Sequence, residues 1–256
     1  MSTSNNMLNI LTLFSIQEPV LDADTICEKL KFSKPTGYRY IKDLVAHGLL
    51  QRLYGGQYTF GPRISVMDYI SQQSNPIIRL SVPLMVDIVE QTEFNCCLTQ
   101  LYEDYCLDIH HQSYRDSDLL AYGRGRPRPI YAGAAPKTIL AFSHLKTQKS
   151  IYQKFADQFT QTQFAHTEQE FVKKLTDVKR QGFYTSKSEL ESHLGAIAVP
   201  LSYSDKTPPL ALSVVGSVKR FNLIDTQTIV GILSHAAKTI EEEMKAVEND
   251  TKSRAL

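Results

Sequence analysis

Residues 33–50 read SKPTGYRYIKDLVAHGLL, and this stretch predicts one well-delimited helix. Ser33 is a good N-cap residue, and Pro35 falls in the first turn, where its missing N–H costs nothing. Ile41 and Leu44 lie at helical spacing and predict the buried face. Gly48 is placed to end the helix in a left-handed conformation. A helix from about residue 34 to residue 47 follows.

The neighbouring segments place this helix in a small domain. Residues 7–14 carry apolar side chains at helical spacing and predict a first helix. Asp22 predicts the cap of a second helix, which leads into the turn before Ser33. Residues 50–53 and 57–60 flank Gly55-Gly56, a two-residue hairpin signal. The order helix, helix, short turn, helix and hairpin predicts a winged helix-turn-helix over residues 1–61.

Positive charge is concentrated around the third helix. Residues 29–52 hold six basic residues and one acidic residue, a net charge of +5, whereas the whole chain carries +1. A local patch of this kind suits contacts with DNA phosphates and bases. We predict a DNA-binding surface made of Ser33, Lys34, Thr36, Tyr38, Arg39, Lys42, Arg52 and Tyr54. The alternative interpretation is a solvated basic helix in an unrelated domain.

The remaining residues predict a linker helix over residues 62–78 and a second domain over residues 79–256. Patterns of four predicted strands alternate there with patterns of helices, which indicates an α+β fold class. The strands are expected at residues 95–102, 105–113, 194–202 and 210–216, and the helices near 82–89, 136–142, 171–178 and 225–247.

Composition narrows the class of protein. Hydrophobic residues make up 42% and charged residues 21%, as in ordinary globular proteins. We see no secretory signal and no run long enough to span a membrane, and therefore expect no membrane partner. Cys27, Cys96, Cys97 and Cys106 form no C-x-x-C pair and indicate no disulfide framework, so a reducing cytoplasm is the expected location.

Enzymatic signatures are weak. There is no G-x-S-x-G elbow and no phosphate-binding loop of the Walker type. His110-His111 invites a metal interpretation, but neighbouring side chains on a strand point to opposite faces, so we expect no metal and no cofactor. Lys137 with Ser186 could suggest a nucleophile, although no base can be assigned to them. We expect no enzyme activity.

Several motifs together resemble the IclR family of transcriptional regulators. They occur in the family's order over nearly the whole chain, at residues 33–44 with 47–50, 56–63, 131–141, 182–184 with Ser186 and Glu189, and 196–200. The resemblance implies an N-terminal winged helix-turn-helix, a linker helix and a GAF-like α/β effector-binding domain. It also implies homodimers or homotetramers and a small organic or aromatic acid as effector.

The resemblance also implies an effector pocket. It maps to Ala134, Ala135, Ser186, His193, Ala196, Ser213 and Val215. Backbone N–H groups of the two small residues before a helix would meet an anion. Ala196 and Val215 stand where members that bind very small acids have polar side chains, and His193 replaces a common glycine. These departures favour a larger or more apolar ligand, or a ligand contact by His193. Ordinary turn or strand packing is the alternative for Ser186, Ser213 and His193.

Arg124, Arg126 and Arg128 alternate in a glycine- and proline-rich stretch before the pocket turn. They could attract a carboxylate or take part in a subunit contact. Because flexible loops commonly carry such charges, solvated loop arginines are the favoured interpretation.

The sequence thus predicts a ligand-responsive regulator that binds double-stranded operator DNA as a dimer or tetramer. One alternative is a small-molecule enzyme whose N-terminal domain serves assembly, and another is an adaptor that binds a protein partner and no DNA. The effector, the operator and the sign of regulation do not follow from these residues.

Overall fold

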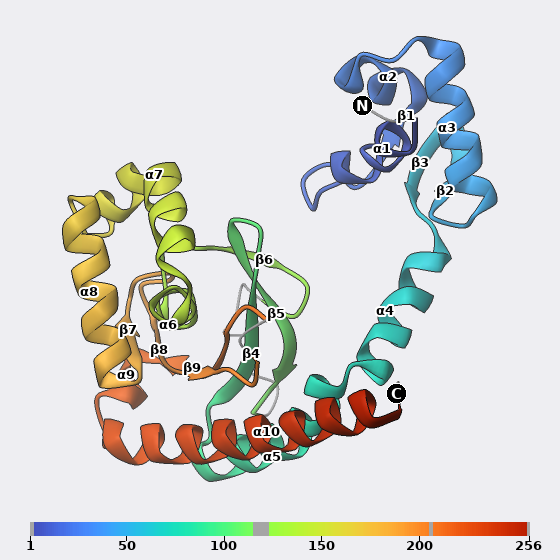
Figure 1. Cartoon of the computed structure of the whole chain (residues 1–256). Helices are drawn as coiled ribbons and strands as arrows, with labels where there is room; N and C mark the ends of the chain where they lie inside the picture. The colour runs from blue at the N-terminus through green and yellow to red at the C-terminus, as the bar shows by residue number, and fades with distance from the viewer. Residues whose placement is uncertain (1–2, 115–122, 205–206, 255–256) are drawn as a thin grey trace. The chain divides into compact units, whose positions relative to one another are not determined.

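The computed structural model describes residues 3–114, 123–204 and 207–254 (Figure 1). The chain divides into two compact units, Met1–Asn75 and Pro76–Leu256. Within the described residues, no helix is both long enough and apolar enough to cross a membrane. Each unit has its own hydrophobic core.

The first unit is a winged helix-turn-helix. Its helices are α1 (Thr3–Leu8), the short 3-10 helix η1 (Leu11–Leu13), α2 (Ala23–Leu30) and α3 (Lys34–Ala46). Its antiparallel sheet has the order β1-β3-β2, with β1 (Leu21–Asp22), β2 (Leu50–Arg52) and β3 (Gln57–Phe60). Ile10, Ile26, Ile41, Leu44 and Leu50 are buried in the core between helices and sheet.

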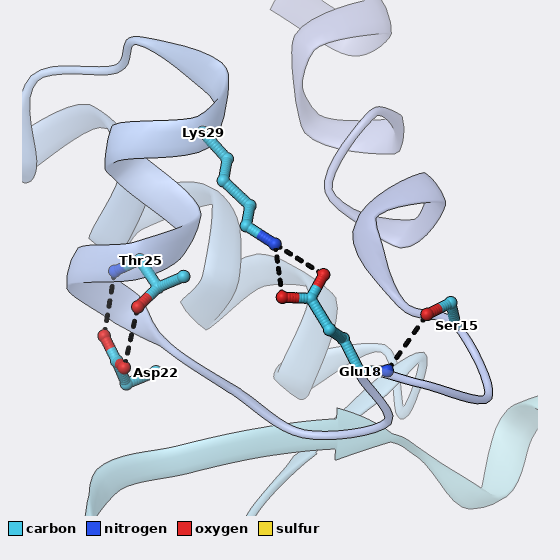
Figure 2. A network of polar contacts seen from close by, with 5 residues as sticks. All are labelled: Ser15, Glu18, Asp22, Thr25 and Lys29. Carbon is cyan, nitrogen blue, oxygen red and sulfur yellow. Dashed lines mark hydrogen bonds and ion pairs between the residues drawn. The ribbon is translucent and has the colours of Figure 1, made fainter.

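Three polar contacts fix the start of α2 and the segment before it (Figure 2). The backbone N–H of Thr25 donates to Asp22 Oδ1 at 2.8 Å, and this bond confirms the predicted N-cap. Lys29 Nζ donates to Glu18 Oε1 at 2.7 Å, while the N–H of Glu18 donates to Ser15 Oγ at 3.0 Å. The preceding loop is therefore held against the exposed side of α2.

The predicted limits of α3 are confirmed, with one change at its start. Ser33 is the N-cap residue, but its side chain makes no capping bond, and its hydroxyl donates instead to Thr36 Oγ1 at 2.9 Å. Gly48 has φ +72° and ends the helix as predicted. Gly37 lies where α3 meets α2, because a Cβ there would overlap the Sγ of Cys27.

Two local predictions in this unit are wrong. The first helix does not continue to Phe14: α1 ends at Leu8 and a tighter 3-10 turn follows, although Ile10 and Phe14 remain buried. The hairpin is also not a two-residue turn. The N–H of Leu53 donates to the Gln57 carbonyl, so the connection is the three-residue helix η2 (Tyr54–Gly56).

Helix α4 (Pro62–Ser74) follows the wing, where a linker helix was expected. It belongs to the first unit and has no buried residue. Val66, Met67, Tyr69 and Ile70 are all exposed on it. These side chains make an apolar helix surface that the first unit itself does not cover.

The second unit is built on a six-stranded antiparallel sheet of order β6-β5-β4-β9-β8-β7. The predicted strands are present as β4 (Asn95–Tyr102), β5 (Tyr105–Gln112), β8 (Leu194–Leu201) and β9 (Leu210–Ser217). The short strands β6 (Pro127–Pro129) and β7 (Tyr184–Lys187) complete the two edges and were not predicted.

Helices cover both faces of this sheet (Figure 1). On one face, α5 (Pro76–Thr92) and α10 (Thr226–Arg254) pack on strand residues such as Ile197, Leu212 and Val214. On the other face lie α6 (Ala134–Phe142), α7 (Leu145–Gln161) and α8 (Glu168–Gln181), which pack on Ala198 and Ala211. The short α9 (Val218–Phe221) follows β9.

Candidate functional site

A small cavity that opens to solvent lies where the N-terminus of α6 meets the sheet. Six of the seven predicted effector residues line it: Ala134, Ala135, Ser186, Ala196, Ser213 and Val215. Leu190, Glu191 and Leu194 also line it and were not indicated by the sequence, and so does Arg128, for which attraction of a carboxylate was one of the interpretations. The cavity therefore has small and apolar walls with a few polar groups.

Strand register explains why these residues meet. Ala196 pairs with Ser186 on one side and with Val215 on the other. Ser213 lies two residues before Val215, so both side chains leave β9 on the same face. This is the face covered by α6, and alanine at position 196 leaves space beneath the helix.

The N-terminus of α6 supplies hydrogen-bond donors. Gly133 is the N-cap residue with φ +96°, a backbone conformation that favours glycine. Helix geometry leaves the N–H groups of Ala134 and Ala135 without intrahelical acceptors. The N–H of Gly133 is already used, because it donates to Glu189 Oε2 at 3.1 Å.

Glu189 also holds the buried Lys137. The Lys137 side chain is only 1% exposed and pairs with Glu189 Oε2, while Tyr184 donates its hydroxyl to Glu189 Oε1 at 3.0 Å. The Lys137 Nζ lies 4.7 Å from the ring centroid of Phe164. Burial lowers the pKa of Lys137, and Glu189 opposes that shift. Lys137 thus ties α6 to the loop after β7, and it makes no pair with Ser186.

Arg128 corrects the interpretation of the arginine-rich stretch. Arg124 and Arg126 are exposed, but Arg128 lies on β6 with an 8% exposed side chain and pairs with the fully buried Asp108. Thr99 Oγ1 donates to Asp108 Oδ1 at 2.7 Å. Burial raises the pKa of Asp108, and the guanidinium opposes that shift. A solvated-loop role is therefore wrong for Arg128, which lies on the edge strand β6 and lines the cavity.

His193 is the one predicted effector residue that does not line the cavity. Its side chain is 54% exposed, and its Nε2 lies 3.7 Å from Glu191 Oε2. Glu191 and Leu190 line the cavity instead. Both lie in the loop between β7 and β8, and no periodic pattern in the sequence describes the path of such a loop.

The predicted DNA-binding residues lie on α3 and on the wing. Lys34, Tyr38, Arg39 and Lys42 are exposed along α3, Ser33 and Thr36 lie at its start, and Arg52 and Tyr54 are exposed at the hairpin. Five of the eight residues therefore lie on one helix, with Ser33 at its N-cap, and α2 packs against this helix.

The positive charge of this surface is smaller than the residue count suggests. Lys29 is paired with Glu18, and Lys34 Nζ lies 3.0 Å from Asp24 Oδ1. Tyr38 also donates to Asp24, at 3.4 Å, and the Asp24 carboxylate raises the pKa of both Lys34 and Tyr38. Both acidic residues precede residue 29, so a charge count over residues 29–52 does not include them.

The remaining candidate groups do not assemble into a site. Cys27, Cys96, Cys97 and Cys106 are all free and buried, and burial raises the pKa of each thiol. Burial also lowers the pKa of His110. In residues 3–114, 123–204 and 207–254, no group of three or more His, Cys, Asp or Glu side chains could hold a metal ion.

Comparison with known proteins agrees with this architecture. A family model described as "Bacterial transcriptional regulator IclR C-terminal" matches residues 69–242, which is more than half of the chain. The chain belongs to the IclR family. The curated regulator KdgR of Dickeya chrysanthemi is 24% identical over 249 residues, covering 94% of this chain and 81% of KdgR. KipR of Bacillus subtilis is 23% identical over 213 residues, covering 83% of this chain and 84% of KipR.

Solved structures share the fold of this IclR regulator. An IclR homolog from Microbacterium hydrocarbonoxydans, complexed with 4-hydroxybenzoate, has a TM-score of 0.76 at 18% identity, covering 96% of this chain and 100% of that chain. An IclR regulator from Brucella abortus has a TM-score of 0.77 at 18% identity, covering 95% of this chain and 92% of that chain. The chain is therefore a transcriptional regulator by family, and its relatives are regulators rather than enzymes.

Proposed function

We propose that this IclR regulator binds operator DNA through α3 and its wing, as a dimer or tetramer, and that a small organic acid in the cavity controls that binding. The observation that carries the DNA part is the row of exposed side chains on α3. Arg39 and Lys42 lie three residues apart on the solvent side, while Ile41 and Leu44 anchor the helix in the core. Such a helix can enter the major groove with its polar side foremost.

The cavity supports an acid as the controlling ligand. The N–H groups at the start of α6 are donors that suit a carboxylate, and the Ser213 hydroxyl, which makes only a long bond of 3.5 Å to the Cys97 carbonyl, can turn to the same ligand. Leu194, Ala196 and Val215 are apolar walls that suit a carbon skeleton of more than two or three atoms. The Microbacterium homolog holds 4-hydroxybenzoate, an aromatic acid of that kind.

The exposed apolar side of α4 supports assembly. Val66, Met67, Tyr69 and Ile70 are exposed on α4, and the first unit does not cover them. A cluster of exposed apolar side chains on one helix is typical of a protein contact. We propose that the same helix of a second copy covers it. Two winged helices would then meet two half-sites of an operator.

A gel-shift titration tests the DNA part at fixed salt, with the DNA upstream of the regulator's own gene. Arg39→Ala and Lys42→Ala should each weaken specific binding, Arg39→Ala by about 1–3 kcal/mol if it contacts a guanine. Lys149→Ala, a lysine on α7 that pairs with Glu168, is a matched control that should bind as the wild type does. Unchanged affinity in both α3 variants would refute the recognition-helix proposal.

A thermal-shift screen of organic acids tests the cavity. At least one acid should raise the unfolding midpoint of the wild type, because a ligand that binds only the folded state stabilises it. Ser213→Leu should abolish that shift by filling the cavity. Ser143→Leu, outside the cavity at the end of α6, is the control and should keep the shift.

A further inference from the structure

Glu191 is a cavity residue whose carboxylate is not satisfied by the chain. Its Oε1 is buried and has no hydrogen-bond partner among the described residues. Its Oε2 lies 3.7 Å from His193 Nε2, beyond hydrogen-bond distance. The residue lines the cavity and lies in the loop between β7 and β8.

The neighbouring Glu189 shows that an unbonded carboxylate oxygen is not a general property of the loop. Both Glu189 oxygens are used: Oε2 accepts from Lys137 and from the Gly133 N–H, and Oε1 accepts from Tyr184. Two glutamates in the loop between β7 and β8 thus have opposite surroundings. Glu189 fastens the loop to α6, while Glu191 lines the cavity and keeps a buried oxygen that no described group bonds.

A buried acceptor without a partner costs free energy, so such groups in folded proteins call for an explanation. A ligand that supplies the missing donor is one physical explanation. Arg128 lines the same cavity, but it makes no hydrogen bond to Glu191 Oε1, and its Nη2 is paired with Asp108 on the neighbouring strand.

The cavity accordingly carries two different recognition groups. Donors gather at the start of α6, where the Ala134 and Ala135 N–H groups suit an anion. An acceptor stands at Glu191, contributed by a different segment of the chain. A simple carboxylic acid could use only the first group, and its burial beside Glu191 would leave that carboxylate unsatisfied.

We infer that Glu191 selects the effector: it accepts a hydrogen bond from a hydroxyl or ammonium group on the far side of the ligand from its acid group. The inference rests on the proposed effector function and narrows its ligand class to hydroxy acids or amino acids. A site that is built to bond such a group discriminates strongly against the analogue that lacks it, because a buried polar group is then left unpaired.

Matched acids test this on the full-length protein by calorimetric titration. One series is benzoate, 4-hydroxybenzoate and 4-(aminomethyl)benzoate, and the other is butanoate, 4-hydroxybutanoate and 4-aminobutanoate. In at least one series, wild type should bind a donor-bearing acid about tenfold more tightly than the plain acid. The preferred member, hydroxyl or ammonium, identifies the donor.

Variants connect that preference to the residue. Glu191→Met keeps the chain length, has no comparable acceptor, and should reduce the tenfold preference to about one. Glu191→Gln keeps an acceptor without the charge, and should preserve more of a hydroxyl preference than of an ammonium preference. Asp177→Asn, in an exposed ion pair on α8, is the control and should retain the wild-type preference. Without ligand, Glu191→Met should unfold at the wild-type temperature or above it.

The outcomes separate the two proposals. If no acid of either series binds wild type, the acid-effector function and the inference both fail. If acids bind but the plain and donor-bearing members bind equally, or if Glu191→Met keeps the preference, the inference alone fails. A lower unfolding midpoint for ligand-free Glu191→Met would show a structural role for Glu191 and would also overturn the inference.

Discussion

The Asp108–Arg128 pair predicts an asymmetric response to mutation. Asp108 is fully buried and Arg128 is 8% exposed, so neither charge is well solvated if its partner is removed. Breaking a buried pair by removing one partner costs about 3–5 kcal/mol, since a charge is left uncompensated. That is a large fraction of the roughly 5–15 kcal/mol by which a typical domain is stable.

The two single variants should differ because Asp108 can become neutral by taking up a proton, whereas Arg128 cannot lose its charge. In Asp108→Leu, the Arg128 guanidinium stays charged at every accessible pH, so the full loss of about 3–5 kcal/mol should persist from pH 5 to pH 8. In Arg128→Met, Asp108 can take a proton while it keeps the bond from Thr99. Burial already raises the pKa of Asp108, and loss of the guanidinium raises it further.

The sign of the pH dependence follows from linkage. In Arg128→Met the folded-state pKa of Asp108 lies above its unfolded value of about 3.9, so the folded state binds more protons between those two values. Stability therefore falls as the pH rises through that window. The deficit of Arg128→Met relative to wild type should be smaller at pH 5 than at pH 8.

Urea denaturation followed by far-ultraviolet circular dichroism measures these free energies, and hydrogen exchange in β5 assigns the transition to the second unit. The double variant Asp108→Leu with Arg128→Met should lie much closer to wild type than the sum of the single losses, because apolar replacements of a buried pair are often neutral. Equal, pH-independent losses in the single variants, or additive losses in the double variant, would refute the reasoning.

Three further predictions concern local structure. Gly37→Ala should destabilise the first unit by about 1–3 kcal/mol in urea denaturation, because the new methyl group meets the Sγ of Cys27; a neutral result would contradict close packing of α2 on α3. Asp22→Ala should cost about 1 kcal/mol through loss of the α2 cap, whereas Asp22→Asn should retain most of it. Burial lowers the pKa of His110 and His111, so their contribution to stability should be lost as the pH falls below about 6.5. In the double variant His110→Gln with His111→Gln, the thermal unfolding midpoint should depend less on pH below that value. A pH dependence equal to that of the wild type would refute this prediction.

Local chemistry accounts for the elements that the sequence predicted well. Asp22 and Gly48 act within one turn of the helix that each delimits, and near-continuous apolar runs predict β8 and β9 to within one residue at their ends. The winged helix-turn-helix and four of the six strands of the second unit follow from such signals. The positions of six cavity residues came from the family resemblance, and the strand register supplies their physical reason.

The missed elements lack a local signal of that strength. Helix α7 has a kink at Phe155, with φ −125°, and only a few buried side chains over seventeen residues, so its apolar stripe is thin. Strand β6 contains two prolines in three residues, a composition that argues against a strand unless the strand lies at a sheet edge. Strand β7, at the opposite edge, has four residues.

The chemistry of both candidate sites depends on pairs that are distant in sequence, and this limits what a window of residues can predict. Asp24 holds Lys34 and Tyr38, so the charge available on α3 depends on the helix before it. Arg128 differs from Arg126 only because Asp108, twenty residues earlier, lies beneath it. Glu189 and Glu191 differ because Lys137 reaches one and not the other. In each case residues of the same type acquire different roles from one long-range partner, so specificity in this chain is decided by tertiary pairing rather than by the motifs that identify its family.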